Sequence, residues 1–238
     1  MKTSLISLCA VAVALLIPAQ PTLAAEASNN LTLVTIGDST VCDYATTNIK
    51  RGWGQVLRDS LQPSTKLMNL AVGGRSTKTF LETGNWEKAL AAKPDFIFIQ
   101  FGHNDSHAKG QPESTDAATD FAEYLRRYVK EAREVGATPI LVTPPHRLMF
   151  SPEGKLTGEL KPYADSVKRV AHELNVPVVD LYERSGDAFE PMGDSGVDGI
   201  TASQTDRTHF TEKGARIIAG IVVAEMARID PRLKAALK

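Results

Sequence analysis

The tetrapeptide Gly-Asp-Ser-Thr contains Ser39, which is a candidate nucleophile. A serine hydroxyl is a weak nucleophile at neutral pH, so it needs a general base within hydrogen-bond reach. Far along the chain, the segment 205–211 carries Asp206 and, three residues later, His209. A carboxylate so placed can accept a hydrogen bond from the imidazole Nδ1–H and leave Nε2 facing the serine. We therefore predict Ser39 as nucleophile, His209 as base and Asp206 as the orienting acid of an acyl transfer.

Acyl transfer also requires hydrogen-bond donors aimed at the developing oxyanion. The backbone N–H groups of Ser39 and Gly74 can supply two donors, since a glycine permits close approach of the backbone. The side-chain amide of Asn104 can supply a third. The alternatives are structural: Ser39 as a turn or helix-capping serine, and Asn104 as a cap or turn residue, which is a common role for asparagine. The combination favours the oxyanion-hole interpretation.

Two further groups near these residues invite other chemistry. Cys42 follows Ser39 by three residues, but no histidine is near it in sequence, which favours a small packed residue over a reactive thiol. His103 and His107 flank Asp105, a pattern that suggests a metal site. A third ligand is not indicated and serine chemistry uses no metal, so we predict no metal and expect His103 to brace Asn104 or neighbouring backbone.

Four more residues have open alternatives. His146 either borders the pocket or lies on the surface. Trp53 and Trp86 either stack on sugar rings or belong to the core, and we prefer the core for Trp53. Arg75 either meets an acidic sugar or pins its loop by hydrogen bonds, and its position next to the glycine favours the second.

The elements that must position these residues alternate between short apolar runs and helical patterns. Expected strands are 31–36, 66–70, 95–101, 138–143 and 176–181. Expected helices are 54–61, 86–91, 116–135, 162–174 and 212–226, with Thr211 as the cap of the last and Gly136 closing the long middle one. Apolar strands separated by helices predict an open parallel α/β sheet, and parallel strands bring their carboxyl ends to one edge. Polar clusters at 37–40, 71–76 and 102–105 follow the first three of these strands, so we expect them to meet at that edge. The segment 183–208 reads as a long irregular loop that is functional or mobile.

The N-terminal segment, the length and the net charge restrict the class of protein. A lysine, an apolar run over 5–17 and small residues predict a signal peptide over 1–25, cleaved between about 24 and 27, and thus an exported protein of the periplasm or the extracellular space. The rest, 28–238, fits one domain. A formal net charge of −1 gives no reason to expect a nucleic-acid partner, and no later segment suggests a membrane one. The sequence leaves the oligomeric state open.

In chain order, Gly37-Asp38-Ser39, Gly74, Asn104 and Asp206 with His209 resemble the motif blocks of the SGNH/GDSL hydrolase superfamily. The contexts "GWG", "GGRS", "FGHND" and "TDRTHFTEKGA" resemble its rhamnogalacturonan acetylesterase branch. The resemblance implies a flavodoxin-like three-layer α/β/α sandwich with a five-stranded parallel sheet. It implies the triad and oxyanion-hole roles named above and activity without a metal or cofactor.

We expect a secreted serine esterase that removes O-acetyl groups from a plant cell-wall polysaccharide. Rhamnogalacturonan or pectin is the preferred substrate. The alternatives are the same machinery acting on acetyl-xylan, a lipid or a small acyl ester, and a non-catalytic carbohydrate-binding protein of the same fold. The segment 183–208 is expected to shape the choice of substrate.

Overall fold

A computed structural model describes residues 30–238, and the predicted signal peptide lies outside these residues. Five parallel strands form one sheet with the order β2-β1-β3-β4-β5. Their bounds are β1 Thr32–Gly37, β2 Lys66–Asn69, β3 Phe96–Gln100, β4 Thr138–Val142 and β5 Val178–Val179. The five-stranded parallel sheet and its flavodoxin-like order confirm the predicted fold class.

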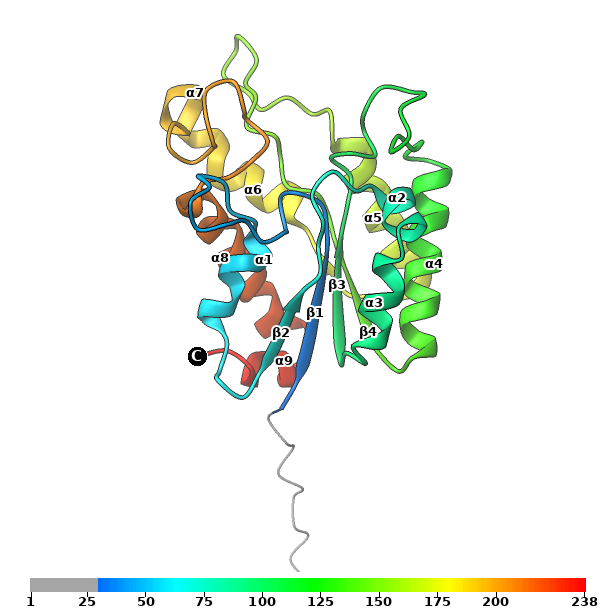
Figure 1. Ribbon diagram of the computed structural model, residues 1–238. Coiled ribbons are helices and arrows are strands. Elements are labelled where there is room, and N and C mark those ends of the chain that lie inside the picture. The colour runs from blue at the N-terminus through cyan, green and yellow to red at the C-terminus, as the bar shows by residue number, and fades with distance from the viewer. Residues whose placement is uncertain (1–29) are drawn as a thin grey trace, which may run out of the picture.

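Helices cover both faces of the sheet, which gives the three layers seen in Figure 1. One layer contains α1 Trp53–Leu57, α6 Leu181–Phe189, α8 Glu212–Ile229 and α9 Pro231–Ala235. The other contains α2 Thr77–Glu82, α3 Asn85–Ala91, α4 Asp120–Glu134 and α5 Lys161–Leu174. Short helical turns complete the chain: η1 Arg58–Ser60, η2 Glu190–Met192 and α7 Gly193–Gly196.

Alternation along the strands builds two apolar cores. In β3, Phe96 and Phe98 pack with α1 and α8, whereas Ile97 and Ile99 pack with α4 and its neighbours. Successive strand side chains point to opposite faces, so a strand buried on both faces is apolar throughout. This pattern fixes the register of β3 and thereby the place where the chain leaves the sheet.

Helix ends follow local signals. Thr211 caps α8 as predicted, because its side-chain oxygen accepts from the Gly214 backbone N–H at 3.5 Å. Gly136, with φ of 82°, follows α4 in the left-handed conformation that glycine tolerates. Asp180 caps α6 by accepting from the Glu183 N–H.

The segment 183–208 is not the long irregular loop that the sequence suggested. Its first part belongs to α6, where Leu181, Tyr182, Ser185 and Phe189 are buried at helical spacing. The polar composition hid this helix because only one face is covered. The fifth strand is correspondingly shorter than 176–181, since α6 begins at Leu181.

Two further helices were not predicted. The sequence analysis missed α2, which begins after the Ser76 cap, and α9, which begins at Pro231. Both are too short to show several turns of apolar periodicity. Neither changes the order of the strands.

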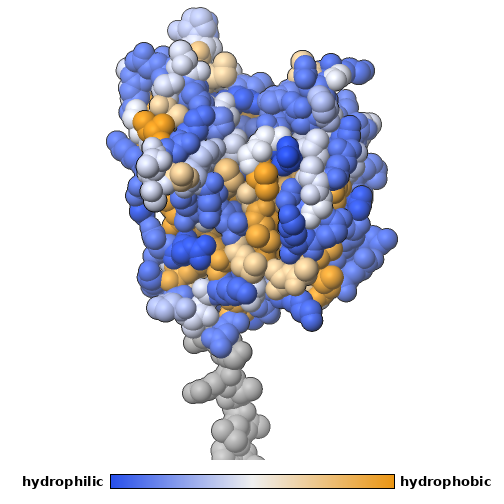
Figure 2. Space-filling model, viewed as in Figure 1, coloured by the Kyte–Doolittle hydropathy of each residue, from blue (hydrophilic) through white to orange (hydrophobic). Residues whose placement is uncertain are grey.

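The surface is hydrophilic over most of the face in Figure 2, with apolar side chains gathered in a strip between the two helical layers. Within residues 30–238, no helix combines the length and apolar character needed to cross a bilayer.

Candidate active site

Three loops that follow strands meet one loop that precedes a helix. Ser39 follows β1, Gly74 follows β2 and Asn104 follows β3, at the upper edge of the sheet in Figure 1. Asp206 and His209 lie just before α8. The parallel sheet thus brings together segments that are far apart in sequence, as the strand-end argument predicted.

Ser39, His209 and Asp206 form one hydrogen-bonded row. Ser39 Oγ lies 2.8 Å from His209 Nε2. Both carboxylate oxygens of Asp206 lie 2.9 Å from His209 Nδ1. The His209 backbone N–H also donates to Asp206 Oδ1 at 3.1 Å, which helps to hold the carboxylate against the Nδ1 side of the ring. This geometry suits proton transfer from the hydroxyl to Nε2 while Nδ1–H stays bound to the acid.

Lys50 is a member of this cluster that the sequence analysis did not identify. Its Nζ lies 2.8 Å from Asp206 Oδ2 and 3.2 Å from His209 Nδ1. Partial burial opposes the charged form of Asp206, but hydrogen bonds from Lys50 and His209 outweigh it and hold the pKa of the carboxyl well below its usual 3.8. Lys50 reaches Asp206 across more than half the chain, and no spacing rule reveals such a contact.

The loop after β2 lies directly against the serine. A Cβ added to Gly73 would stand 3.6 Å from Ser39 Cβ, and Gly74 has a left-handed φ of 76°. Among hydrogen bonds between the described residues, none is donated by the backbone N–H of Ser39 or of Gly74. Asn104 Nδ2 donates to the Arg75 carbonyl at 2.9 Å, which ties the third predicted donor to this loop. The oxyanion role of these groups stays a prediction.

A buried polar chain supports the serine from below. Trp53 Nε1–H donates to Gln100, Gln100 Nε2–H donates to Thr40 Oγ1, and Thr40 Oγ1–H donates to Asp38 Oδ1, each at 2.7 Å. Trp53 is fully buried, which confirms its predicted place in the core. Burial opposes the charge of Asp38, yet His103 and Thr40 lower the pKa of its carboxyl. Ser39 therefore sits between rigidly held neighbours.

His103 does not brace Asn104 as expected. Its Nδ1 lies 3.4 Å from Asp38 Oδ2, and neither ring nitrogen makes a hydrogen bond within the described chain. The ring instead lies beside the buried carboxylate of Asp38, on the loop that follows β1. The amide of Asn104 is held instead by the Arg75 carbonyl.

Asp105 ties together the loops that follow β2 and β3. Its carboxylate accepts from Thr77 N–H at 3.1 Å, Thr77 Oγ1 at 2.5 Å, Thr115 Oγ1 at 2.9 Å and Gly102 N–H at 3.1 Å. Complete burial raises the pKa of this carboxyl to about 7, while the hydroxyl hydrogen bonds pull it down. The aspartate next to Asn104 thus serves the shape of the loop.

Other sequence candidates have structural surroundings. His107 pairs with Glu113 at 2.6 Å, and no group of three metal-ligating side chains occurs in residues 30–238. His146 is buried and stacks on Tyr182 at 3.9 Å between ring centroids, so it is not a surface histidine. Trp86 is fully buried and therefore belongs to the core.

Cys42 is also buried, and its Sγ donates to the Ser39 carbonyl at 3.8 Å. Burial raises the pKa of this thiol to about 11, which leaves it protonated at neutral pH. The packed-residue interpretation fits these surroundings.

Arg147 joins the two halves of the site. Its guanidinium donates to the His103 carbonyl at 2.9 Å and to Ser106 Oγ at 3.2 Å, and on the other side to Thr208 Oγ1 at 2.9 Å. His103 and Thr208 are the direct neighbours of Asn104 and His209. A hollow of about 460 Å³ beside Arg147 is also lined by Ser106, Met149, Thr157 and Glu159.

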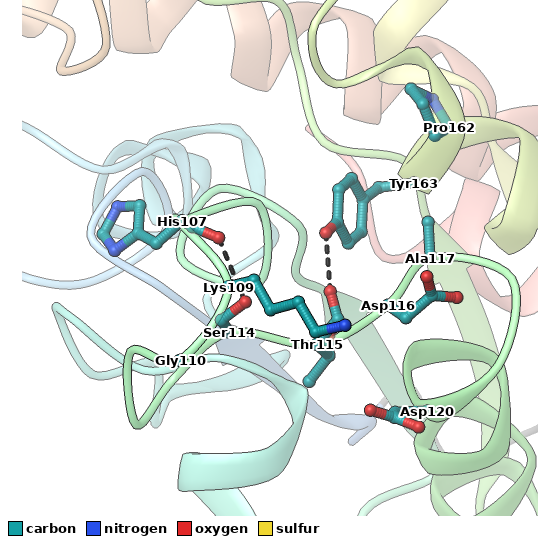
Figure 3. A pocket seen from close by; sticks show the side chains of 10 residues that line it. All are labelled: His107, Lys109, Gly110, Ser114, Thr115, Asp116, Ala117, Asp120, Pro162 and Tyr163. Carbon is teal, nitrogen blue, oxygen red and sulfur yellow. Dashed lines mark hydrogen bonds between the residues drawn. The ribbon is translucent and has the colours of Figure 1, made fainter.

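A second hollow of about 400 Å³ is shown in Figure 3. It lies along the loop between β3 and α4, where the Tyr163 hydroxyl donates to the Thr115 carbonyl at 2.7 Å. None of Ser39, Asp206 and His209 lines it. The reacting groups therefore lie outside this hollow.

Residues 35–217 match the GDSL-like Lipase/Acylhydrolase family. Over 192 residues the chain is 39% identical to "Probable rhamnogalacturonan acetylesterase YesY" of Bacillus subtilis (strain 168), which covers 78% of this chain and 88% of that protein. Over 218 residues it is 34% identical to "Rhamnogalacturonan acetylesterase RhgT" of the same organism, covering 83% and 90%.

Solved structures resemble the fold. The crystal structure of YxiM from Bacillus subtilis superposes with a TM-score of 0.75 and 29% identity, over 84% of this chain and 56% of that one. The acetylxylan esterase Axe2 from Geobacillus stearothermophilus superposes with a TM-score of 0.64 and 20% identity, over 82% and 93%. At 20% identity, the superposition shows that this chain and Axe2 share a fold, and it shows nothing about their substrates.

Proposed function

Because the chain belongs to the GDSL-like lipase/acylhydrolase family, we propose that this carboxylic ester hydrolase removes O-acetyl groups from rhamnogalacturonan through a Ser-His-Asp acyl-enzyme mechanism. The observation that carries the mechanism is the row of hydrogen bonds from Ser39 Oγ through His209 to Asp206. An isolated serine would need no imidazole at 2.8 Å, and a binding protein would need no oriented base.

In the first half-reaction, Ser39 Oγ attacks the acetyl carbonyl carbon while His209 Nε2 takes its proton. The carbonyl electron pair moves to oxygen, and the N–H groups of Ser39 and Gly74 with the Asn104 amide stabilise the oxyanion. Collapse of this intermediate breaks the bond to the sugar oxygen, which receives the proton from His209. The sugar leaves with a free hydroxyl and Ser39 carries the acetyl group.

In the second half-reaction, His209 removes a proton from water, which attacks the acetyl carbon. The same donors stabilise the second oxyanion. Its collapse releases acetate and returns the proton to Ser39 Oγ. Asp206 stays ionised throughout and stabilises the imidazolium formed in both steps.

The names of the two relatives support the choice of substrate, since both contain rhamnogalacturonan acetylesterase and both align over most of this chain. Acetylated xylan is the principal competing polymer. We also propose that residues 1–25 direct export and that residues 28–238 form the single esterase domain of the mature protein.

Ser39→Ala tests the mechanism. We expect hydrolysis of p-nitrophenyl acetate and acetate release from acetylated rhamnogalacturonan fragments to fall by about 10⁴-fold or more, because the nucleophile is lost. Ser195→Ala, at an exposed serine in α7, is the matched control and should retain wild-type rates. A Ser39→Ala protein that keeps its activity would refute the mechanism. Faster deacetylation of xylan than of rhamnogalacturonan would refute the substrate.

A further inference from the structure

We propose that the guanidinium of Arg75 binds a carboxylate of the saccharide substrate, so that the enzyme selects acetyl esters on or beside uronic acid residues. This inference rests on the proposed function and names the chemical group that would give it selectivity. Arg75 belongs to the loop that carries Gly74, and this loop lies against Ser39.

Arg75 is anchored in the site through its backbone, not its side chain. Its carbonyl accepts from Asn104 Nδ2 at 2.9 Å, and its N–H donates to the Val72 carbonyl at 3.3 Å. The next residue, Ser76, caps α2 through its side chain. These contacts hold the loop without help from the guanidinium. The expectation that Arg75 pins its loop by side-chain hydrogen bonds is therefore wrong.

The guanidinium itself has no partner in the part of the chain that the structure describes. It makes neither a hydrogen bond nor an ion pair there, and its Nε is buried without an acceptor. The terminal nitrogens are not among the buried atoms and remain open to solvent. An arginine that is partly withdrawn from water without an acceptor loses hydrogen bonds to water. An incoming anion would replace them.

Other cations around the site are already occupied. Lys50 pairs with Asp206, and Arg207 pairs with Asp194 and Asp198. A substrate carboxylate at those positions would have to displace an internal partner.

Two more arginines are occupied by the protein itself. Arg51 donates to backbone carbonyls of its own loop, among them that of Thr46 at 3.0 Å. Arg147 donates to three oxygen atoms and faces Glu159 at 3.7 Å.

The hollow of Figure 3 is also unsuited to an anion. Lys109 lines it, but the carboxylates of Asp116 and Asp120 line it too. Among the cations named here, Arg75 is the one on the loop that lies against Ser39, and its guanidinium has no partner among the described residues.

The chemistry of the guanidinium points to a carboxylate. Its planar donors match two carboxylate oxygens, whereas a neutral sugar offers only single hydroxyls. Rhamnogalacturonan contains galacturonic acid, as its name states, so this polymer carries carboxylates along its chain. Xylose units carry no carboxylate. Arg75 would therefore separate the two polymers that compete for the same catalytic groups.

The first test compares Arg75→Gln with the wild type on matched substrates. The substrates are acetylated galacturonate-containing oligosaccharides, acetylated xylo-oligosaccharides of equal length and p-nitrophenyl acetate. We expect the ratio of kcat/KM for the acidic over the neutral substrates to fall about 10- to 100-fold, the value of one charge-assisted hydrogen-bond pair. Arg75→Lys, which keeps the charge without the fork, should fall between. Arg228→Gln, at an exposed arginine of α8, should leave the ratio unchanged.

The second test does not depend on the acetylated polymer. Unacetylated galacturonate oligosaccharides should inhibit hydrolysis of p-nitrophenyl acetate by the wild type, more weakly as salt is added. Their inhibition constant should rise about 10- to 100-fold in Arg75→Gln. Neutral xylo-oligosaccharides should show no such difference between the two proteins.

Three outcomes would overturn the inference. They are an unchanged substrate ratio in Arg75→Gln, an equal loss of its activity on all substrates, or inhibition by galacturonate oligosaccharides that is equally strong in Arg75→Gln and the wild type. An equal loss would mean that Arg75 serves the shape of the loop or the oxyanion itself. The proposed function fails separately, if the wild type hydrolyses p-nitrophenyl acetate but releases no acetate from any saccharide. The inhibition experiment still decides the role of Arg75 in that case.

Discussion

At the scale of single residues, Asp206 is contacted by two cationic or potentially cationic groups at once. Lys50 and His209 both lie against its carboxylate. The lysine stabilises the carboxylate, so the acid that orients the base remains ionised in acidic solution. The same ammonium lies 3.2 Å from His209 Nδ1, so Lys50 contacts both the acid and the base of the proposed mechanism.

Lys50→Met should move the acid limb of the kcat/KM profile to higher pH by about half to one unit. The pKa of the Asp206 carboxyl rises when the ammonium is lost, so the acid that orients the base loses its charge at a higher pH. The measurement is a pH series of p-nitrophenyl acetate hydrolysis, with Lys88→Met at an exposed site of α3 as control. An unchanged acid limb would show that Lys50 has no electrostatic role in the site.

The ionised carboxylate of Asp206 also stabilises the folded protein. Its folded pKa lies below the usual 3.8, so ionisation favours the folded state above that pH. This contribution is lost as the pH falls from the unfolded value through the folded one. Acid therefore lowers the free energy of unfolding as the Asp206 carboxylate becomes protonated.

The sequence pointed to Ser39, Asp206 and His209, which the structure places in one hydrogen-bonded row, but it did not point to the residues around them. Ser39, Asp206 and His209 stand in motifs with short local spacing, which a reader of the sequence can recognise. Lys50 and the empty guanidinium of Arg75 depend on which side chains meet across the fold. The ring of His103 was assigned to the wrong neighbour for the same reason.

At the scale of elements, Arg147 acts as a positioning residue between loops. It follows β4 and reaches both the loop after β3, which carries Asn104, and the loop before α8, which carries His209. Because proton transfer and oxyanion binding both need sub-ångström placement, a link between these loops has catalytic value.

Arg147→Met should lower kcat for p-nitrophenyl acetate about 10- to 100-fold with a smaller change in KM, because the reacting groups lose alignment. Arg147→Lys should recover part of the loss. Arg126 also donates to several oxygens but belongs to α4, so Arg126→Met is the matched control. If kcat falls only in proportion to the folded fraction measured by circular dichroism, Arg147 is merely structural.

Among the elements, β1 to β4 were predicted within one residue at every end, because uninterrupted apolar runs with both faces buried leave few alternatives. Helix α6 was missed because Leu181 was assigned to the end of a strand, and Ser185 and Gly186 to a loop. Tertiary burial, above all of Phe189, outweighs that local composition.

At the scale of the molecule, the C-terminal helix α9 closes the layer that contains α1 and α8. Leu233 is fully buried in that core, and Arg232 lies 4.6 Å above the Phe96 ring at the start of β3. The backbone of Lys238 donates to the Ser60 carbonyl at 3.0 Å. These contacts lie at the opposite end of the sheet from Ser39 (Figure 1).

Leu233→Ala should therefore lower the free energy of unfolding by about 2–5 kcal/mol while kcat at 25 °C stays near the wild-type value. Urea denaturation followed by fluorescence measures the first, and p-nitrophenyl acetate hydrolysis measures the second. Lys234→Ala, at the exposed neighbouring position, should change stability by no more than about 0.5 kcal/mol. A loss of kcat without a loss of stability would contradict this separation of core and site.

The hydrogen bond between Ser39 and His209 joins positions 170 residues apart. Closing so long a segment costs entropy that only the docked sheet and helix α8 can offset. A growing polypeptide therefore contains the serine long before it contains the imidazole. Ester cleavage by this mechanism cannot begin until synthesis has passed His209 and α8 has packed against the sheet.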